Sequence, residues 1–365
     1  MQVKRLHIDQ IKEGMIVAED IYTDSNALVL MCNTVLNDDI LKRLRKLEIY
    51  RICIYEPEDQ ELTVEEEIQQ KDNYLHKEKI RRSEDFKEFK KIFDDTVLRL
   101  EKSFARVLDQ SGDLEGLNQL TGMIASLVGR GHGTLYVLDM LNCMREYDDV
   151  TFAHCISVSI LCRLMGEWQN LPESELHVLT LCGLLHDVGK LQIPSSIISK
   201  PGKLTEEEYL KVQEHPMLGY ETLKGTDVDE RVKLAALMHH ERCDGKGYPL
   251  KIASDQIEQY SKIVMIADVY DAMTADRSYR AGMCPFEVLR VLGQEGYQKY
   301  DPRYLVTFME RTAQSYINST VRLSDQRIGE VISVDLHEIA RPLLRVDGGF
   351  VDLKKEKDLN IVKII

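Results

Sequence analysis

The chain has 365 residues, of which 44% are hydrophobic and 30% charged, as is typical of folded globular proteins. One compact core seldom accommodates this length, so we expect two or three structural units. The net charge of −14 at pH 7 argues against binding to a nucleic acid polymer, which requires a basic surface, but is compatible with a local basic pocket for a small phosphate ligand.

No run of about 20 apolar residues occurs in the chain, so we expect no membrane span. The N-terminal stretch MQVKRLHIDQIKEGM lacks the apolar core of a signal peptide. The eight cysteines are scattered and form no CxxC pair, which favours reduced thiols over a disulfide framework. Together these features predict a cytoplasmic protein.

Residues 1–58 are predicted to form a small α+β domain. The segments MIVAEDIY, ALVLM and YRICIY are rich in β-forming residues and are typical of short strands. Between them, NDDILKRLRKLEI offers Asn37 or Asp38 as a helix cap. Its apolar residues fall at helical spacing, namely Ile40, Leu41, Leu44 and Leu47.

Residues 59–111 are predicted to form a charged helical linker. The segment 63–108 contains neither glycine nor proline, and its apolar residues recur at helical spacing: Ile92, Phe93, Val97, Leu98, Leu100 and Phe104. This pattern predicts one or two long helices. They could serve as a solvated spacer or as a signalling helix that forms a homodimer, and the heptad pattern is not sustained enough to decide.

Residues 112–316 carry most of the helical periodicity and most of the histidines. Residues 317–365 change character again, because the β-forming segments TVRLSD, IGEVISVD, PLLRVDGGFVDL and NIVKII are separated by turn residues. Asp347-Gly348-Gly349 is typical of a hairpin turn. The fold class is therefore predicted to be mainly α, with a β-rich C-terminal extension.

Several histidines and aspartates of the helical region lie among apolar residues. Taken singly, a residue such as His154 is more often a buried histidine with a hydrogen-bond partner than a metal ligand. Asp187 follows CGLL and Asp268 lies within IVMIA, where a buried carboxylate is costly unless it is paired or bound to a metal. The residues one helical turn before Asp268 are apolar, so its partner must come from elsewhere.

Taken together, these residues form a set of candidate metal ligands: His154, His186, Asp187, His215, His239, His240 and Asp268. Mixed imidazole and carboxylate ligands suit iron, manganese, zinc or nickel better than calcium. The set is too large for one ion and fits two ions that share a bridging carboxylate. Such a pair can lower the pKa of a bridging water and clamp a phosphate.

Three cationic residues accompany these candidate ligands. Lys190 follows His186 closely, and Arg277 and Arg280 would share a helical face if the helix continued that far. A guanidinium binds phosphate oxygens in a bidentate manner. The combination of metals and cations predicts an anionic phosphoester substrate.

The region 112–316 resembles the HD-GYP family, a branch of the HD superfamily of metal-dependent phosphohydrolases. The resemblance is carried by HDVGK (186–190), EHP with His215, HHERCDGKGYP (239–249) and ADVYDAMTADRSYR (267–280). It implies an all-helical HD-type bundle that holds two or three metal ions, usually iron or manganese. It also implies hydrolysis of cyclic di-GMP to pGpG and further to GMP.

The resemblance also implies roles for individual residues. The seven candidate ligands would bind the metals, with Asp187 as the bridge. Lys190, Arg277 and Arg280 would hold the phosphates, and Lys190 would also protonate the leaving oxygen. Asp271 occupies the position of an acid close to the metals. The GYP loop, with Tyr248, would shape the substrate site and carry contacts to protein partners.

Two positions depart from the family pattern. Members with three metals have a glutamate four residues before the first histidine, where this chain has Val150, so we expect two metals. Cys243 occupies a loop position that usually holds a larger side chain. It is either a tolerated loop substitution or a thiol near the metals.

These observations lead to three functional hypotheses. In the first, a hydroxide that bridges two metals attacks a phosphorus of cyclic di-GMP. In the second, the chain is a catalytically weak signalling or adaptor module that binds protein partners. In the third, the same chemistry acts on another cyclic dinucleotide, such as cyclic GMP-AMP, because residues that read the base are not identifiable from the motifs.

Overall fold

The computed structural model describes residues 2–8, 11, 15–19, 21–22, 28–30, 34, 36, 38–46, 49, 51–56, 80–109, 113–129, 134–144, 150–198, 200, 202–275, 282–335 and 337–365. The chain divides into two compact units, Met1–Lys71 and Asp72–Ile365. Each unit has its own hydrophobic core and is described by itself.

In its described residues, the first unit contains one helix and two small antiparallel sheets. Strand β1 (Gln2–His7) pairs with β4 (Arg51–Glu56), and β2 (Ile21–Tyr22) pairs with β3 (Leu28–Leu30). Helix α1 (Asp38–Lys46) buries Leu41 and Leu44 in the core of this unit. The predicted α+β character is confirmed, but β1 was not predicted. The strand expected over MIVAEDIY is reduced to β2 and an isolated bridge between Val17 and Ile54.

Helix α3 (Glu84–Leu108) belongs to the second unit and is not a free linker. It begins where the Ser83 side chain accepts a hydrogen bond from the Phe86 N–H. Phe93, Leu100 and Phe104 are buried in the core of the second unit, whereas Leu98 is 57% exposed. A helical linker was predicted for residues 59–111, and within that range residues 84–108 are helical but pack into the second unit. Most of the apolar stripe faces the unit's own core, so it does not support a homodimer through this helix.

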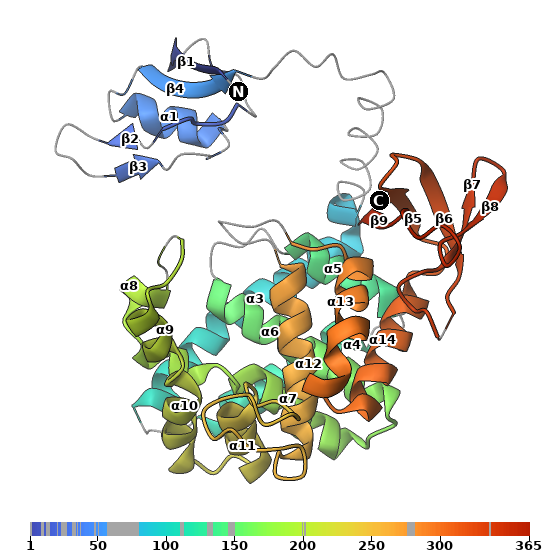
Figure 1. Cartoon of the computed structure of the whole chain (residues 1–365). Helices are drawn as coiled ribbons and strands as arrows, with labels where there is room; N and C mark the ends of the chain where they lie inside the picture. The colour runs from blue at the N-terminus through green and yellow to red at the C-terminus, as the bar shows by residue number, and fades with distance from the viewer. Residues whose placement is uncertain are drawn as a thin grey trace. The chain divides into compact units, whose positions relative to one another are not determined.

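The remaining helices of the second unit form a bundle (Figure 1). They are α4 (Leu114–Val128), α5 (Thr134–Met144), α6 (Val150–Trp168), α7 (Glu173–Leu185), α8 (Ser195–Ile198), α9 (Glu206–Val212), α10 (His215–Lys224), α11 (Glu230–Met238), α12 (Gln259–Thr274), α13 (Pro285–Lys299) and α14 (Pro302–Ser315). A short 3₁₀ helix, η2 (Val188–Gln192), follows α7. The predicted mainly helical fold is confirmed.

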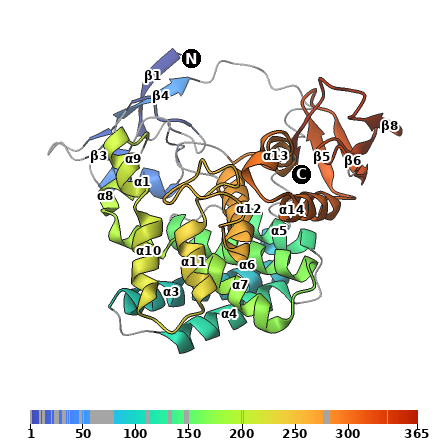
Figure 2. The same ribbon diagram turned by 60° about the horizontal axis from the view of Figure 1, so that its bottom comes forward.

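Helix α6 lies at the centre of this bundle because it is apolar on nearly all sides. It packs against α3, α4, α7, α12 and α14. A helix that is hydrophobic all round is stable only when buried, and Ile156, Ile160 and Cys162 are indeed inaccessible to solvent. Figure 2 shows α10, α11 and α12 side by side, and the loop 239–258 joins the last two. These packed helices fix the positions of the polar side chains at their ends.

The C-terminal residues form a five-stranded antiparallel sheet in the order β8-β7-β6-β5-β9. Its strands are β5 (Thr320–Leu323), β6 (Ile328–Ser333), β7 (Leu343–Val346), β8 (Gly349–Asp352) and β9 (Ile361–Ile364). Asp347 and Gly348 both have positive φ, 50° and 78°, between the paired residues Val346 and Gly349. Positive φ at both positions suits the twist of a two-residue hairpin, so the predicted turn is confirmed.

The sequence also raised two questions that concern single features, a membrane span and the state of the cysteines. Within the described part of the chain, no helix is long and apolar enough to cross a membrane. The described cysteines are all free thiols: Cys53, Cys143, Cys155, Cys162, Cys182, Cys243 and Cys284.

Candidate metal centre

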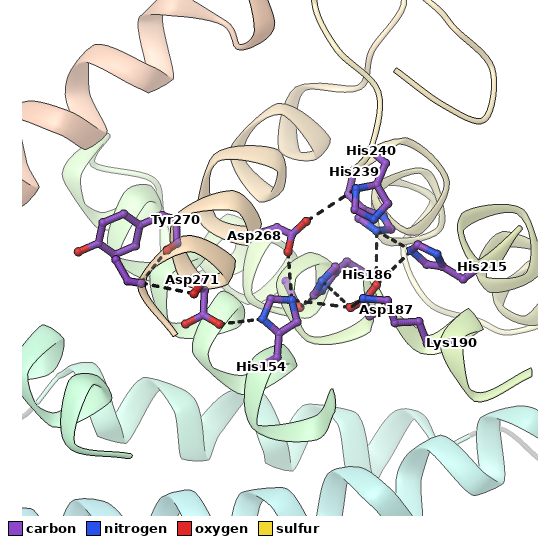
Figure 3. A network of polar contacts seen from close by, with 12 residues as sticks. His154, His186, Asp187, Lys190, His215, His239, His240, Asp268, Tyr270 and Asp271 are labelled. Carbon is purple, nitrogen blue, oxygen red and sulfur yellow. Dashed lines mark hydrogen bonds and ion pairs between the residues drawn. The ribbon is translucent and has the colours of Figure 1, made fainter. Parts of the chain in front are cut away.

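The ends of several helices bring the candidate ligands into one buried cluster (Figure 3). His154 lies near the start of α6, and His215 is the first residue of α10. The pairs His186-Asp187 and His239-His240 directly follow α7 and α11. Asp268 is the exception, because it lies inside α12. The structure thus brings together all seven residues that the sequence suggested.

Asp187 lies at the centre of the cluster and is almost completely buried. Its Oδ2 is 3.3 Å from His186 Nε2 and 3.7 Å from His154 Nε2. Its Oδ1 is 3.2 Å from His215 Nε2 and 3.5 Å from His239 Nε2. Each carboxylate oxygen therefore faces a different pair of imidazoles, as a carboxylate shared by two sites would.

Asp268 reaches both halves of the cluster from α12. Its Oδ1 lies 3.0 Å from His154 Nε2, and its Oδ2 lies 3.9 Å from His240 Nδ1. The partners that are missing from its own helix thus come from α6 and from the residues after α11. This placement offsets the cost of a carboxylate among the buried residues of α12.

The backbone orients three of the imidazoles. The Nδ1–H groups of His186, His215 and His239 donate to carbonyl oxygens of Gly183 (2.8 Å), Val212 (2.6 Å) and Ala236 (3.0 Å). A neutral imidazole with its proton on Nδ1 presents a bare Nε2 lone pair, which is the usual arrangement of metal-binding histidines. Nε2 of His215 and Nε2 of His239 lie 3.1 Å apart, so two lone pairs face each other unless a cation or proton lies near them.

The cluster fits divalent metal ions. His186 Nε2 and Asp187 Oδ1 are buried and have no hydrogen-bond partner among the described residues, although such groups are rarely left unsatisfied. The donor atoms fall into two groups with ligand atoms within 4.8 Å of one another, one of His154, His186 and Asp187, the other of Asp187, His215, His239 and His240. A cation in each group would satisfy the buried atoms. Asp187 belongs to both groups.

Burial and close neighbours shift the pKa values of the cluster's titratable groups. Although burial opposes it, the electrostatic interactions with the neighbouring His186 and Lys190 side chains hold the pKa of the Asp187 carboxyl well below its usual range. Burial lowers the pKa of His239 to about 4 and also keeps the pKa of His240 low. Burial would likewise lower the pKa of His154, but hydrogen bonds to Asp268 and Asp271 raise it to about 9.

Metal binding at pH 7.5 is expected to release about one proton from His154. With a pKa of about 9, this imidazole is protonated in the metal-free protein, whereas a metal requires a bare nitrogen. His239, with a pKa of about 4, is already neutral at this pH. The release should therefore decline as the pH rises through 9. Calorimetry with Mn²⁺ in buffers of different ionisation enthalpy measures it, and binding without proton release at pH 7.5 would contradict the expectation.

Two further predicted residues lie directly against the cluster. The Lys190 ammonium, on η2, is 2.5 Å from Asp187 Oδ2. Asp271 Oδ2 is 2.7 Å from His154 Nδ1, so in this structure Asp271 orients a candidate ligand. Arg277 and Arg280 lie outside the described residues. Cys243 is not in either ligand group, and its backbone N–H donates to the Lys299 carbonyl.

A glycine allows η2 and α10 to approach closely enough to build the cluster. A Cβ atom on Gly189 would lie 2.0 Å from the His215 carbonyl oxygen and 2.5 Å from the Gly219 nitrogen. The glycine of HDVGK therefore permits direct backbone contact, which brings His215 beside Asp187. Any larger residue would push the two elements apart.

Replacing Gly189 with alanine should destabilise the protein by about 1–3 kcal/mol or more, as overpacking in a rigid core does. It should also weaken metal binding, because His215 would move. Gly122→Ala in α4 is the matched control, since a Cβ added there would meet no atom within 4 Å and alanine favours a helix by up to about 1 kcal/mol. Urea unfolding compares the two, and equal midpoints for both variants would refute the packing argument.

The residues after His240 form an ordered loop that the sequence did not explain. The carboxylate of Glu241 is buried and accepts hydrogen bonds from backbone N–H groups of residues 250–252. The Tyr248 ring stacks on His240. Tyr248 was expected to contact substrate, whereas here it contacts a candidate ligand. In the sequence, Glu241 is marked only by its position directly after two candidate ligands. That position does not indicate that its carboxylate is buried or which groups it binds.

Parts of this chain are similar in sequence to known proteins. Residues 138–304 match a family model described as HD domain. The chain is 32% identical over 240 residues to the cyclic di-GMP phosphodiesterase PA4108 of Pseudomonas aeruginosa, covering 66% of this chain and 57% of that protein. It is 37% identical over 172 residues to the cyclic di-GMP phosphodiesterase response regulator RpfG of Xanthomonas campestris, covering 46% of each.

A further relative acts on a different dinucleotide. The 3'3'-cGAMP-specific phosphodiesterase 1 of Vibrio cholerae is 38% identical over 156 residues, which are 43% of this chain and 36% of that protein. The chain therefore spans only about half the length of these curated relatives, or less. The cluster around Asp187 lies within residues 138–304, the part of the chain that matches the HD domain model.

Proposed function

We propose that this chain is a metal-dependent phosphodiesterase of the HD domain family, in its HD-GYP branch, and that it hydrolyses cyclic di-GMP. The observation that carries the proposal is the pair of ligand groups that share Asp187. A single histidine site would fit many functions. Two adjoining sites joined by one carboxylate are the arrangement that phosphoester hydrolysis uses.

We further propose that two divalent ions, iron or manganese, bind in these groups with Asp187 as the shared ligand. Zinc or nickel would also suit the donor set. Asp268 would complete the coordination from α12, since it faces His154 and His240. When bound, divalent ions activate water and neutralise the charge of a phosphate.

The protein's own residues would bind and orient the substrate. Lys190 places a positive charge beside Asp187, where it can neutralise a phosphoryl oxygen and deliver a proton to the leaving oxygen. Arg277 and Arg280 would hold the remaining phosphate oxygens. Asp271 would keep His154 in the tautomer that presents Nε2 to the centre. The products would be pGpG and, after a second cut, GMP.

Cyclic GMP-AMP is the second candidate substrate, because three relatives from Vibrio cholerae are named for it. Purified protein loaded with Mn²⁺ or Fe²⁺ should be given cyclic di-GMP and cyclic GMP-AMP at equal concentration, and the products separated by chromatography. Faster linearisation of cyclic di-GMP supports the main proposal, and a preference for cyclic GMP-AMP replaces the substrate. Absence of any turnover by metal-loaded protein would favour an adaptor that acts through protein contacts at the GYP loop.

A further inference from the structure

The loop after His240 is closed by one buried carboxylate. Glu241 is only 1% exposed, and its Oε1 accepts hydrogen bonds from the N–H groups of Leu250 (2.5 Å) and Lys251 (3.1 Å). Its Oε2 accepts from the Ile252 N–H at 3.2 Å. Three backbone donors thus compensate the burial of the acid, and the acid satisfies three donors that a loop would otherwise leave unpaired. The segment from Glu241 to Ile252 is therefore tied at both ends.

The loop crosses its own backbone at a glycine. A Cβ atom on Gly247 would lie 2.4 Å from Glu241 Cα and 2.5 Å from the Arg242 nitrogen. Gly245 has a φ of 72°, in the left-handed region that favours glycine. The next residue after the crossing, Tyr248, donates its backbone N–H to the His240 carbonyl at 3.1 Å. The chain thus returns to the ligand from which it started.

This return places an aromatic ring on His240. The Tyr248 and His240 rings stack with centroids 4.7 Å apart and planes inclined by 27°. His186, His215 and His239 are oriented by backbone carbonyls, and His154 by Asp271. In the described part of the chain no carbonyl accepts from the His240 ring, whose Nδ1 is 3.9 Å from Asp268. The His240 ring also lies against the rings of His239 and His215, at centroid distances of 4.1 and 5.0 Å, so packing against these rings and Tyr248 fixes its orientation.

We propose that Glu241 is a positioning residue for His240. Its carboxylate closes the loop 241–252 and thereby holds the Tyr248 ring against the His240 imidazole. The inference rests on the proposed function only in that His240 must bind a metal. It concerns metal binding and not the identity of the substrate. Outer partners of this kind typically change metal affinity by about 10–100-fold.

Two variants test two separate contacts, that of Glu241 with the loop backbone and that of Tyr248 with His240. Glu241→Ala should weaken binding of the second Mn²⁺ ion about 10–100-fold, measured by calorimetry without substrate. Tyr248→Ala should produce a similar loss, whereas Tyr248→Phe, which keeps the ring, should bind like the wild type. Asp255→Asn is the matched control, since it removes an exposed carboxylate from the same connection. If Glu241→Ala fails to fold, Glu241→Gln, which keeps one acceptor oxygen, takes its place.

Amide hydrogen exchange reports on closure of the loop independently of metal binding. In metal-free protein, Glu241→Ala should lose protection at residues 250–252, whereas Tyr248→Ala should keep it. Wild-type metal affinity in Glu241→Ala despite lost protection would overturn the inference. The inference would also be overturned if Glu241→Ala lost affinity for the second Mn²⁺ ion and Tyr248→Ala did not. A wild-type protein that binds no second ion would overturn it as well. A wild type that binds two ions but cleaves no dinucleotide would refute the proposed function and leave this inference standing.

Discussion

Replacing Asp187 with asparagine is expected to abolish metal binding and phosphodiesterase activity together. Both carboxylate oxygens face imidazole pairs, so an amide, with one neutral oxygen and an NH2 group that can only donate, cannot serve both groups. Metals contribute several kcal/mol to such reactions, and since about 1.4 kcal/mol is tenfold in rate, kcat should fall by at least about a thousandfold. Metal content by elemental analysis and turnover of cyclic di-GMP measure the two losses.

The control for Asp187→Asn is Asp255→Asn, which makes the same chemical change at an exposed position. Circular dichroism should show that both variants are folded, because asparagine has nearly the same size as aspartate. An Asp187→Asn protein that keeps two ions and normal turnover would contradict the role of Asp187 as the shared ligand. If the variant lost activity but kept its full metal content, Asp187 would act in catalysis without being needed for metal binding.

Replacing Lys190 with methionine should separate charge stabilisation from metal binding. The Lys190 ammonium lies against Asp187 and is partly exposed on η2, so it can also reach a phosphate bound at the centre. Burial opposes its charge, but Asp187 and Asp268 raise the pKa of Lys190, so it is cationic at neutral pH. Loss of one such charge typically lowers kcat by about 10²–10³-fold. Metal content should remain close to that of the wild type.

Lys200→Met is the comparison for Lys190→Met, because Lys200 lies nearby in the chain and pairs with Glu208 instead of the cluster. Its kcat should be unchanged. Steady-state kinetics on cyclic di-GMP distinguish the two variants. If Lys190→Met kept wild-type kcat and raised only KM, Lys190 would contribute equally to binding of the ground state and the transition state, and the proposed proton delivery would be wrong.

The helical elements and the site cluster could be predicted from the sequence because local signals report them well. An aspartate such as Asp268 within a run of apolar residues indicates a paired or metal-bound carboxylate, whatever the fold. Five histidines accompany it, so the chemistry of the cluster could be predicted before its geometry. The turn at Asp347-Gly348 could also be predicted from a local signal, because positive φ at both positions favours these residue types.

Features that depend on distant partners could not be predicted in this way. Strand β1 is defined by its pairing with β4, some fifty positions later, and its own residues alternate too briefly to show it. The apolar stripe of α3 looks the same whether it faces a partner helix or its own core. The burial of Glu241 depends on backbone N–H groups, which carry no sequence signal at all.

The packing of α3 has a mechanical consequence. This helix is the first described element of the second unit after the segment that follows the first unit, and it touches both α6 and α10. His154 of one ligand group lies on α6, and His215 of the other group lies on α10. A tightly packed interior transmits displacement with little loss. A displacement of α3 applied at Glu84 would therefore be passed to helices that carry ligands of both groups.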